Sequence, residues 1–394
     1  MHEPTIRKLR ISPPIAVVFV VVTVVLPGCS SGEVAQDAKV GSTSSSATPR
    51  GGGQANHAAQ STAPSYENWR RSMLSSRLLA KGCFHAVHPD TRWEEVPCNS
   101  SPLCSSFPFG CLDFDVGGEN ISPSLETGGM TGGGATISSA EGSFQVTNVS
   151  SVYSEHPGSG VTINDEYSVQ LNTTSDFNVP VCADAADPAH CYSAPQFVFA
   201  NYGSSYPGRL TIVYWIMNYG DSCPLGWAYH GNSSCVKRGP SIDIAENQPI
   251  TNLANLKLTA TVTSDGADTL TLSTGSDIYA LNPPGQESYA NLAQRWNFVE
   301  FNVFGSDGSA RAVFNPNATI LVQTILTSST TSSPTFSKFG MTAESNNLNF
   351  VQSSYCAFGG TEPKIQFLES NANPPPQPPF CLLNDITPIE LPLQ

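Results

Sequence analysis

Short apolar segments separated by turn-forming residues most constrain the fold of this chain. Tyr167–Leu171 alternates strictly between polar and apolar residues, as a half-buried strand does. Glycine, proline, asparagine and aspartate lie between such segments and interrupt them. Many short strands without intervening helices predict an antiparallel β-sandwich or jelly roll. The predicted strands cover 167–171, 197–199, 210–219, 256–262, 270–272, 298–304, 320–326 and 364–368.

Eleven cysteines, an odd number, add a second constraint. The first of them, Cys29, ends a Leu-Pro-Gly-Cys sequence that resembles the bacterial lipobox, in which the cysteine is lipidated. The other ten form an even set, which in an exported chain predicts disulfide bonds. They are Cys83, Cys98, Cys104, Cys111, Cys182, Cys191, Cys223, Cys235, Cys356 and Cys381.

Short sequence separations predict two local disulfides, Cys182–Cys191 and Cys223–Cys235. The other six cysteines can pair in many ways, and the sequence does not choose among them. A zinc site is disfavoured, because no two cysteines have the C-x-x-C spacing. We therefore expect an all-β fold: a disulfide-stapled, concanavalin-like sandwich with no metal site.

The N-terminus predicts export. Basic residues precede the apolar run Ile15–Leu26, which is too short to span a bilayer and is typical of a signal peptide. Residues 1–28 are expected to be a lipoprotein signal peptide. The mature protein would then be an exported bacterial lipoprotein, held by lipidated Cys29 at the extracellular face of the cell envelope. Ordinary cleavage nearby, with Cys29 left free, is the alternative.

Composition divides the remaining chain into four parts. Residues 29–65 are rich in serine, glycine and alanine and are expected to be a flexible tether. Residues 66–139 contain a predicted helix, Tyr66–Ala80, then a cysteine-rich module and a glycine-rich loop. The β-sandwich is expected to cover 140–370. The proline-rich residues 371–394 are expected to form an extended C-terminal strap.

Charge and missing motifs narrow the function. The formal net charge of −14 argues against nucleic acid as a partner, because such binding depends on clustered lysine and arginine. The sequence has no H-E-x-x-H, G-x-S-x-G, phosphate-binding glycine loop or EF-hand spacing, so no cofactor is expected. Contact with a membrane is expected through the lipid anchor only.

Two polar residues stand in otherwise apolar predicted strands. Gln196 begins a Gln-Phe-Val-Phe segment, and Glu300 lies in the middle of Phe298–Phe304. Period-two alternation places Glu300 on the same strand face as Phe298 and Asn302, where its carboxyl group is expected to be desolvated. One class of acid peptidase needs a Glu as base and then acid, with a Gln amide that stabilises the tetrahedral oxyanion.

Several short motifs are also informative: Gly82-Cys83-Phe84, Trp93-x-Glu95-Val96-x-Cys98, Tyr214-Trp215, Pro249-Ile250-Thr251-Asn252-Leu253 and Glu344-x-Asn346-Asn347-Leu348. The stretch that contains them, from Cys83 to about Ser370, resembles a little-characterised family of exported bacterial proteins.

Three strands carry a more distant resemblance: the Gln196 strand, the Tyr214-Trp215 strand leading to Cys223-Pro224, and the Val299-Glu300 strand. They are similar to strands of the plant neprosin and fungal glutamic-peptidase families, which are β-sandwich acid peptidases with Glu/Glu or Gln/Glu pairs. The resemblance implies that Gln196 and Glu300 are catalytic and that the substrate is an extended polypeptide. The groove that binds it is expected to be lined by Tyr214, Trp215 and Trp296.

Two other functions remain open from the sequence, so the chain need not be an enzyme. A non-catalytic, lectin-like module would bind a glycan by stacking aromatic rings on sugar faces, with Tyr206, Trp215, Trp227 and Tyr229 as candidates. A structural envelope protein would have no small substrate, and the cysteine-rich segment 83–111 would be its docking surface.

Overall fold

Alternating apolar residues determine how the central strands pack. In a computed structural model of the chain, Val299, Phe301 and Val303 of β16 (Phe298–Phe304) belong to the main apolar core. The residues between them do not, so they project from the opposite face of the strand. The neighbouring strand β7 (Glu166–Thr174) shows the same division. The sheet that contains both strands therefore has one apolar core face and a second face available for polar side chains.

The structure describes residues 65–76, 81–99, 128–130, 136–156, 160–174, 179–203, 206–263, 268–283, 291–306, 310–337, 342, 344–351 and 354–376. All of them lie in the unit Ser61–Gln394. The predicted signal peptide and Cys29 lie outside the described residues, as do Cys104, Cys111 and Cys381. The same holds for nearly all of the predicted tether and for most of the predicted strap.

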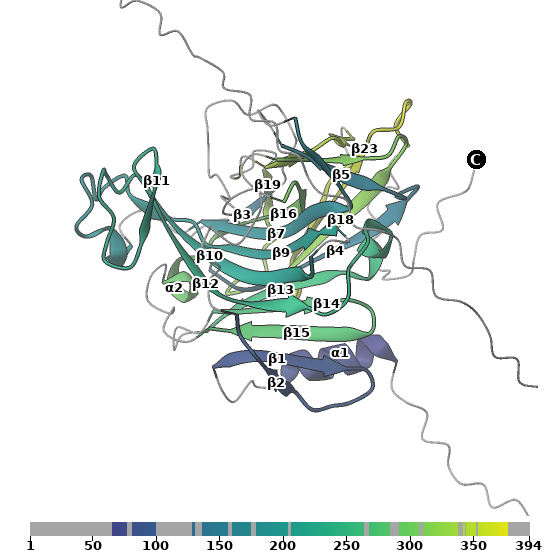
Figure 1. The fold of residues 1–394 in the computed structure, drawn as a ribbon, viewed down its shortest axis with the longest axis horizontal. Coiled ribbons are helices and arrows are strands. Elements are labelled where there is room, and N and C mark those ends of the chain that lie inside the picture. Colours follow the sequence, from purple (N-terminus) through teal and green to yellow (C-terminus); the bar gives the residue numbers. More distant parts are fainter. Residues whose placement is uncertain are drawn as a thin grey trace, which may run out of the picture. The chain divides into compact units, whose positions relative to one another are not determined.

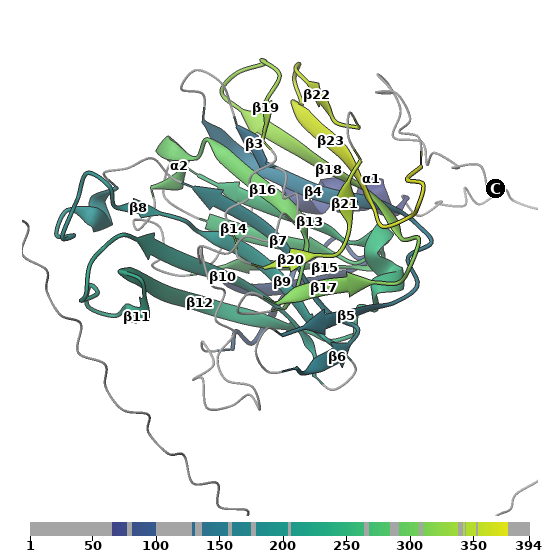
Figure 2. The same ribbon diagram turned by 90° about the horizontal axis from the view of Figure 1, so that it is seen from above.

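Two large antiparallel sheets contribute to one core (Figures 1 and 2). In the described part of the chain, sheet A has the order β2-β1-β15-β14-β13-β4-β18-β23-β21, with β22 also paired to β23. Its strands are β1 (Gly82–Val87), β2 (Glu94–Val96), β4 (Ile137–Thr147), β13 (Lys257–Val262), β14 (Asp268–Ser273), β15 (Asp277–Asn282), β18 (Thr319–Ser328), β21 (Asn349–Phe350), β22 (Cys356–Phe358) and β23 (Lys364–Ser370).

Sheet B has the order β11-β12-β10-β9-β7-β16-β3-β19, with β8 also paired to β10. Besides β7 and β16, its strands are β3 (Gly128–Met130), β8 (Tyr192–Ser193), β9 (Gln196–Tyr202), β10 (Gly208–Met217), β11 (Ala228–Gly231), β12 (Ser234–Ile244) and β19 (Thr335–Ser337). These two sheets confirm the predicted all-β sandwich.

The remaining described elements are short. A third sheet has the order β20-β17-β5-β6 and is formed by β5 (Val152–Glu155), β6 (Thr162–Asn164), β17 (Arg311–Phe314) and β20 (Ser345–Asn346). The helices are α1 (Tyr66–Ser75) and α2 (Leu292–Arg295), with 3-10 turns at Pro180–Cys182 and Ile250–Asn255. No helix among these described elements is long and apolar enough to cross a membrane.

The N-terminal helix is a packing element on sheet A. Trp69 and Met73 of α1 form a small apolar cluster with Ala86 of β1 and Ile278 of β15. Beside this cluster, the buried Arg70 guanidinium donates hydrogen bonds to Glu67 and Glu141. The predicted helix Tyr66–Ala80 is therefore present, but it ends at Ser75.

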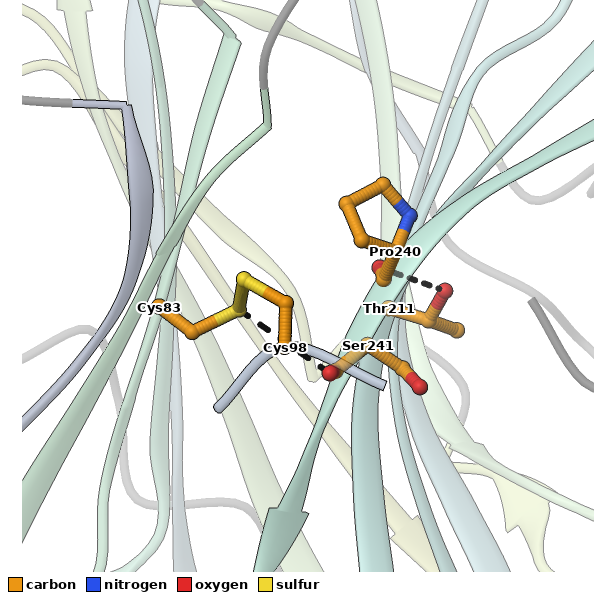
Figure 3. The surroundings of a disulfide bond; sticks show 5 residues. All are labelled: Cys83, Cys98, Thr211, Pro240 and Ser241. Atoms are coloured by element: carbon orange, nitrogen blue, oxygen red, sulfur yellow. Dashed lines mark hydrogen bonds between the residues drawn. A yellow bond between two sulfur atoms is a disulfide. The ribbon is translucent and has the colours of Figure 1, made fainter. Parts of the chain in front are cut away.

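Disulfides fasten the edges of the sandwich. Cys83 of β1 pairs with Cys98, and the next residue, Asn99, forms a bridge with Ser241 of β12. Figure 3 shows this disulfide beside Ser241, so the segment 97–99 joins sheet A to sheet B. Both predicted local disulfides, Cys182–Cys191 and Cys223–Cys235, are confirmed. Disulfides of this kind are typical of an exported protein.

One glycine sets the distance between the sheets at β16. Phe301 stacks on Phe144 of β4, with ring centroids 4.7 Å apart. A Cβ atom at Gly142 would lie 2.2 Å from the Phe301 ring. Only a residue without a side chain leaves room for this ring, because real Cβ contacts are never so short.

The variant Gly142→Ala is expected to lower the free energy of unfolding by about 1–3 kcal/mol, since the new methyl group must displace the Phe301 ring. Urea unfolding monitored by circular dichroism measures the change. The double variant Gly142→Ala/Phe301→Leu should recover part of it relative to the sum of the single variants. Purely additive effects would contradict this packing.

Replacing both Cys83 and Cys98 by alanine is expected to cost about 3 kcal/mol of stability. The disulfide closes a loop with a sequence separation of 15 residues, and the unfolded chain gains entropy without it. Thermal and urea unfolding under oxidising conditions measure the loss. A double variant as stable as the parent would show that the Asn99–Ser241 bridge alone holds this edge.

Candidate functional site

Gln196 and Glu300 lie in one transverse row of sheet B. Gln196 on β9 is opposite Asn172 on β7, and Asn172 is in turn opposite Glu300 on β16. In each of the three strands an adjacent residue belongs to the main core, namely Phe197, Leu171 and Phe301, so these three side chains share the other face of the sheet. The structure thus brings together Gln196 and Glu300, which the sequence analysis predicted as site residues. Asn172, which was not predicted, lies between them.

The row is buried. Gln196 is 2% exposed and Glu300 0% exposed, and Asn172 is also buried. The groove expected from the family resemblance is therefore not an open one at these residues. A buried amide or carboxyl group needs hydrogen-bond partners to offset its lost hydration, so the contacts of this row decide its chemistry.

Asn172 connects to the carboxyl group. Its Nδ2 donates to Glu300 Oε2 at 3.0 Å. Its Oδ1 is buried and has no hydrogen-bond partner among the described residues. Because the nitrogen faces Glu300, the amide oxygen is left as an acceptor within the row between Gln196 and Glu300.

Gln196 is held from both sides. On the β10 side, the Trp215 indole nitrogen donates to Gln196 Oε1 at 2.6 Å. On the β7 side, Gln196 Nε2 donates to Gln170 Oε1 at 3.4 Å. Gln196 is therefore oriented by strands on either side of its own.

The three aromatic residues predicted to line a groove do not lie together. Trp215 shares the face of Gln196 and is buried. Tyr214 lies in the main core, where its hydroxyl donates to Asp268 Oδ2 at 2.8 Å. Trp296 also lies in the core and donates to the backbone oxygen of Phe298. Tyr214, on the opposite face of sheet B, and Trp296, at the end of α2, thus pack in the core of the sandwich and do not line the site.

The aromatic residues considered for glycan binding are also separated. Tyr206 and Tyr229 are exposed, with 45% and 52% of their surface accessible. Trp227 is half-buried and packs against the disulfide-bonded cysteines of a satellite cluster. Trp215 is wholly buried. The described residues therefore do not present these four rings as one platform.

Further polar groups extend the site beyond the row. Asn302, two residues after Glu300, donates from Nδ2 to both carboxyl oxygens of Glu369 at 3.1 Å. Glu369 lies on β23 of sheet A and is fully buried, and Glu344 is fully buried as well. Sequence analysis placed Glu344 and Asn346 only in a family motif and missed Asn172 and Glu369. Asn172 could have been found, because it extends the polar alternation of Ser168 and Gln170.

Burial raises the pKa of Glu369 to about 8, although hydrogen bonds from Asn302 and Asn346 partly oppose this effect. The folded chain therefore keeps this carboxyl group neutral over the acid range. Within the described residues, no group of three or more His, Cys, Asp or Glu side chains could hold a metal ion. The chemistry available here is that of carboxyl and amide groups.

Stability is expected to fall as the pH rises from about 4.5 to about 8. Over this window the folded chain keeps a proton on Glu369 that the unfolded chain releases. The stabilisation that this proton gives is therefore fully present below about pH 4.5 and is lost as the pH rises to about 8. The loss is about 1.4 kcal/mol per pH unit at most. Urea unfolding across this range should show a flatter profile for Glu369→Gln, while the exposed-site variant Glu246→Gln keeps the parent slope. Equal slopes for all three proteins would exclude Glu369 as the cause.

Comparisons with known proteins identify no family. No protein-family model matches the chain, and no curated protein matches it. Among solved structures, the chain is similar to scytalido-glutamic peptidase bound to a peptide-based transition-state analog, at 13% sequence identity and a TM-score of 0.24. That match covers 62% of this chain and 98% of the peptidase chain.

Proposed function

We propose that this chain is an exported, lipid-anchored acid peptidase of the glutamic type, with Gln196 and Glu300 as its catalytic residues. The observation that carries the proposal is the transverse row of Gln196, Asn172 and Glu300 on one face of sheet B. Lipidation at Cys29 would hold the enzyme at the outer face of the envelope, where its substrates would be extended polypeptides.

The spacing in the row supports a shared substrate. Adjacent strands lie about 4.8 Å apart, so the Cα atoms of Gln196 and Glu300 are about 10 Å apart across β7. Each side chain has two methylene groups, which allows the amide and the carboxyl group to approach the same carbonyl group from two sides. Asn172, which lies between them, holds one carboxyl oxygen of Glu300 and so orients the other.

In this mechanism Glu300 takes a proton from a water molecule, whose oxygen forms a bond with the peptide carbonyl carbon. The carbonyl oxygen becomes an oxyanion, and the Gln196 side-chain N–H group stabilises it by a hydrogen bond. Protonated Glu300 then donates its proton to the amide nitrogen as the C–N bond breaks. The products are a carboxylic acid and an amine, and Glu300 returns to its starting state.

An acid working range follows from this chemistry. A group that serves first as base and then as acid must lose and regain a proton in each cycle, which favours a carboxyl group working on the acid side of neutrality. Glu369 also stays protonated throughout this range, so no negative charge is buried beside Asn302.

Purified protein is expected to cleave a denatured polypeptide at pH 3–4, as measured by mass spectrometry of the products over several hours. Glu300→Gln should lose at least about a hundredfold in rate, because the base is removed. Gln196→Ala should lose about ten- to a thousandfold, because an oxyanion donor is removed.

The exposed carboxyl variant Glu246→Gln is the matched control and should cleave like the parent. Circular dichroism and thermal unfolding verify that each variant is folded. Cleavage by folded Glu300→Gln at the parent rate would exclude Glu300 as the base. A parent protein without cleavage at any acid pH would contradict the proposed function itself.

A further inference from the structure

A chain of hydrogen bonds runs across sheet B through the amide of Gln196. It begins at the Trp215 indole N–H group, which donates to Gln196 Oε1 at 2.6 Å. Gln196 Nε2 donates to Gln170 Oε1 at 3.4 Å, and Gln170 Nε2 donates to Ser168 Oγ at 2.8 Å. The Ser168 hydroxyl donates to the backbone oxygen of Gly305 at 2.7 Å.

The group at each end of this series of hydrogen bonds can only donate or only accept. An indole N–H group can donate but not accept, and a backbone carbonyl oxygen can accept but not donate. Every bond between Trp215 and Gly305 must therefore point in the same direction. The orientations of the Gln196 and Gln170 amides, which are often ambiguous in proteins, are determined from both ends.

The direction of these hydrogen bonds determines where the oxygen and the nitrogen of the Gln196 amide point. Trp215 lies on β10, so the amide oxygen faces β10. Gln170 lies on β7, so the amide nitrogen faces the side of the sheet on which Asn172 and Glu300 lie. Only one of the two protons on that nitrogen is used by Gln170, so a second proton is left to donate on the side of the sheet where Asn172 and Glu300 lie.

We propose that Trp215 is a positioning residue that fixes the side-chain amide of Gln196 with its nitrogen towards Glu300, so that Gln196 acts only as a hydrogen-bond donor in the reaction. This inference rests on the proposed function. It assigns Gln196 to the oxyanion and excludes a role as acceptor from the attacking water. The His230 ring packs edge-on against Trp215, with centroids 4.9 Å apart, and helps hold the indole in place.

The first test needs no catalysis. The protein has five tryptophans, so the indole N–H region of a proton–nitrogen NMR spectrum is simple, and Trp215→Phe identifies the Trp215 signal. In Gln196→Leu this signal should move to lower chemical shift and exchange faster with solvent, because its acceptor is gone. An unchanged signal would show that the hydrogen bond is absent and would overturn the inference whether or not the protein is an enzyme.

The second test measures cleavage. Trp215→Phe keeps a buried aromatic ring but removes the donor, and its kcat is expected to fall about ten- to a hundredfold while KM stays within about threefold. Trp69→Phe is the matched control, since Trp69 is equally buried and donates to the backbone oxygen of Asp90 in the loop between β1 and β2, away from sheet B. Its kcat should equal that of the parent. Equal effects of the two variants would overturn the positioning role.

The third test uses Gln196→Glu, which can still accept the bond from Trp215 but donates only when its carboxyl group is protonated. Its activity should decline at a lower pH than that of the parent. A parent-like pH profile would mean that donation from residue 196 is not needed, which overturns the inference. If the parent itself cleaves nothing, the proposed function fails, whereas the NMR test still decides the orientation of the amide.

Discussion

The contact between Phe301 and Gly142 is the constraint on which the candidate site depends. Phe301 lies between Glu300 and Asn302, and its ring occupies the space that a side chain at residue 142 would fill. The position of β16 above sheet A is therefore set by an apolar contact on one face, while polar groups use the other face. A strand that slid by one residue would exchange these faces and bury the carboxyl group in the core.

Ordered hydrogen bonds offset much of the cost of burying the polar face, while the Asn172 amide oxygen has no partner among the described residues. Burying amides and carboxyl groups costs several kcal/mol each unless partners replace water, and partly satisfied networks are the most expensive. The series of hydrogen bonds that runs from the Trp215 indole to the Gly305 carbonyl gives each group in it a defined donor or acceptor. Glu369, which receives two bonds from Asn302, avoids a buried charge by staying protonated. Rigid polar positions of this kind suit catalysis, since reacting groups must be oriented beforehand.

Local patterns predicted eight of the strands and both short-range disulfides, because alternation and short separations are properties of neighbouring residues. The pairing of strands depends on residues far apart in the sequence. For example, β7 lies between β9 and β16 in sheet B, and the alternation within these strands does not predict that order. Tyr214 was assigned to the wrong face because β10 is buried on both sides, which removes the polar half of the pattern. Trp296 lies outside the strands, at the end of α2, where alternation gives no information about its direction. Strand β12 was missed because Gly239 and Pro240 interrupt it at an irregularity in its pairing with β10.

Two carboxyl groups give the fold opposite responses to pH. Burial alone would raise the pKa of Glu67, but hydrogen bonds from Arg70 and Lys257 outweigh it and lower the pKa to about 2. The stabilisation from Glu67 is therefore present above about pH 4.5 and lost as the pH falls towards 2, whereas that from Glu369 is lost as the pH rises towards 8. From these two groups, folding is most favourable near pH 4–5. The acid range proposed for cleavage lies close to this optimum, so the acid-base chemistry proposed for Glu300 and the stability of its scaffold call for similar conditions.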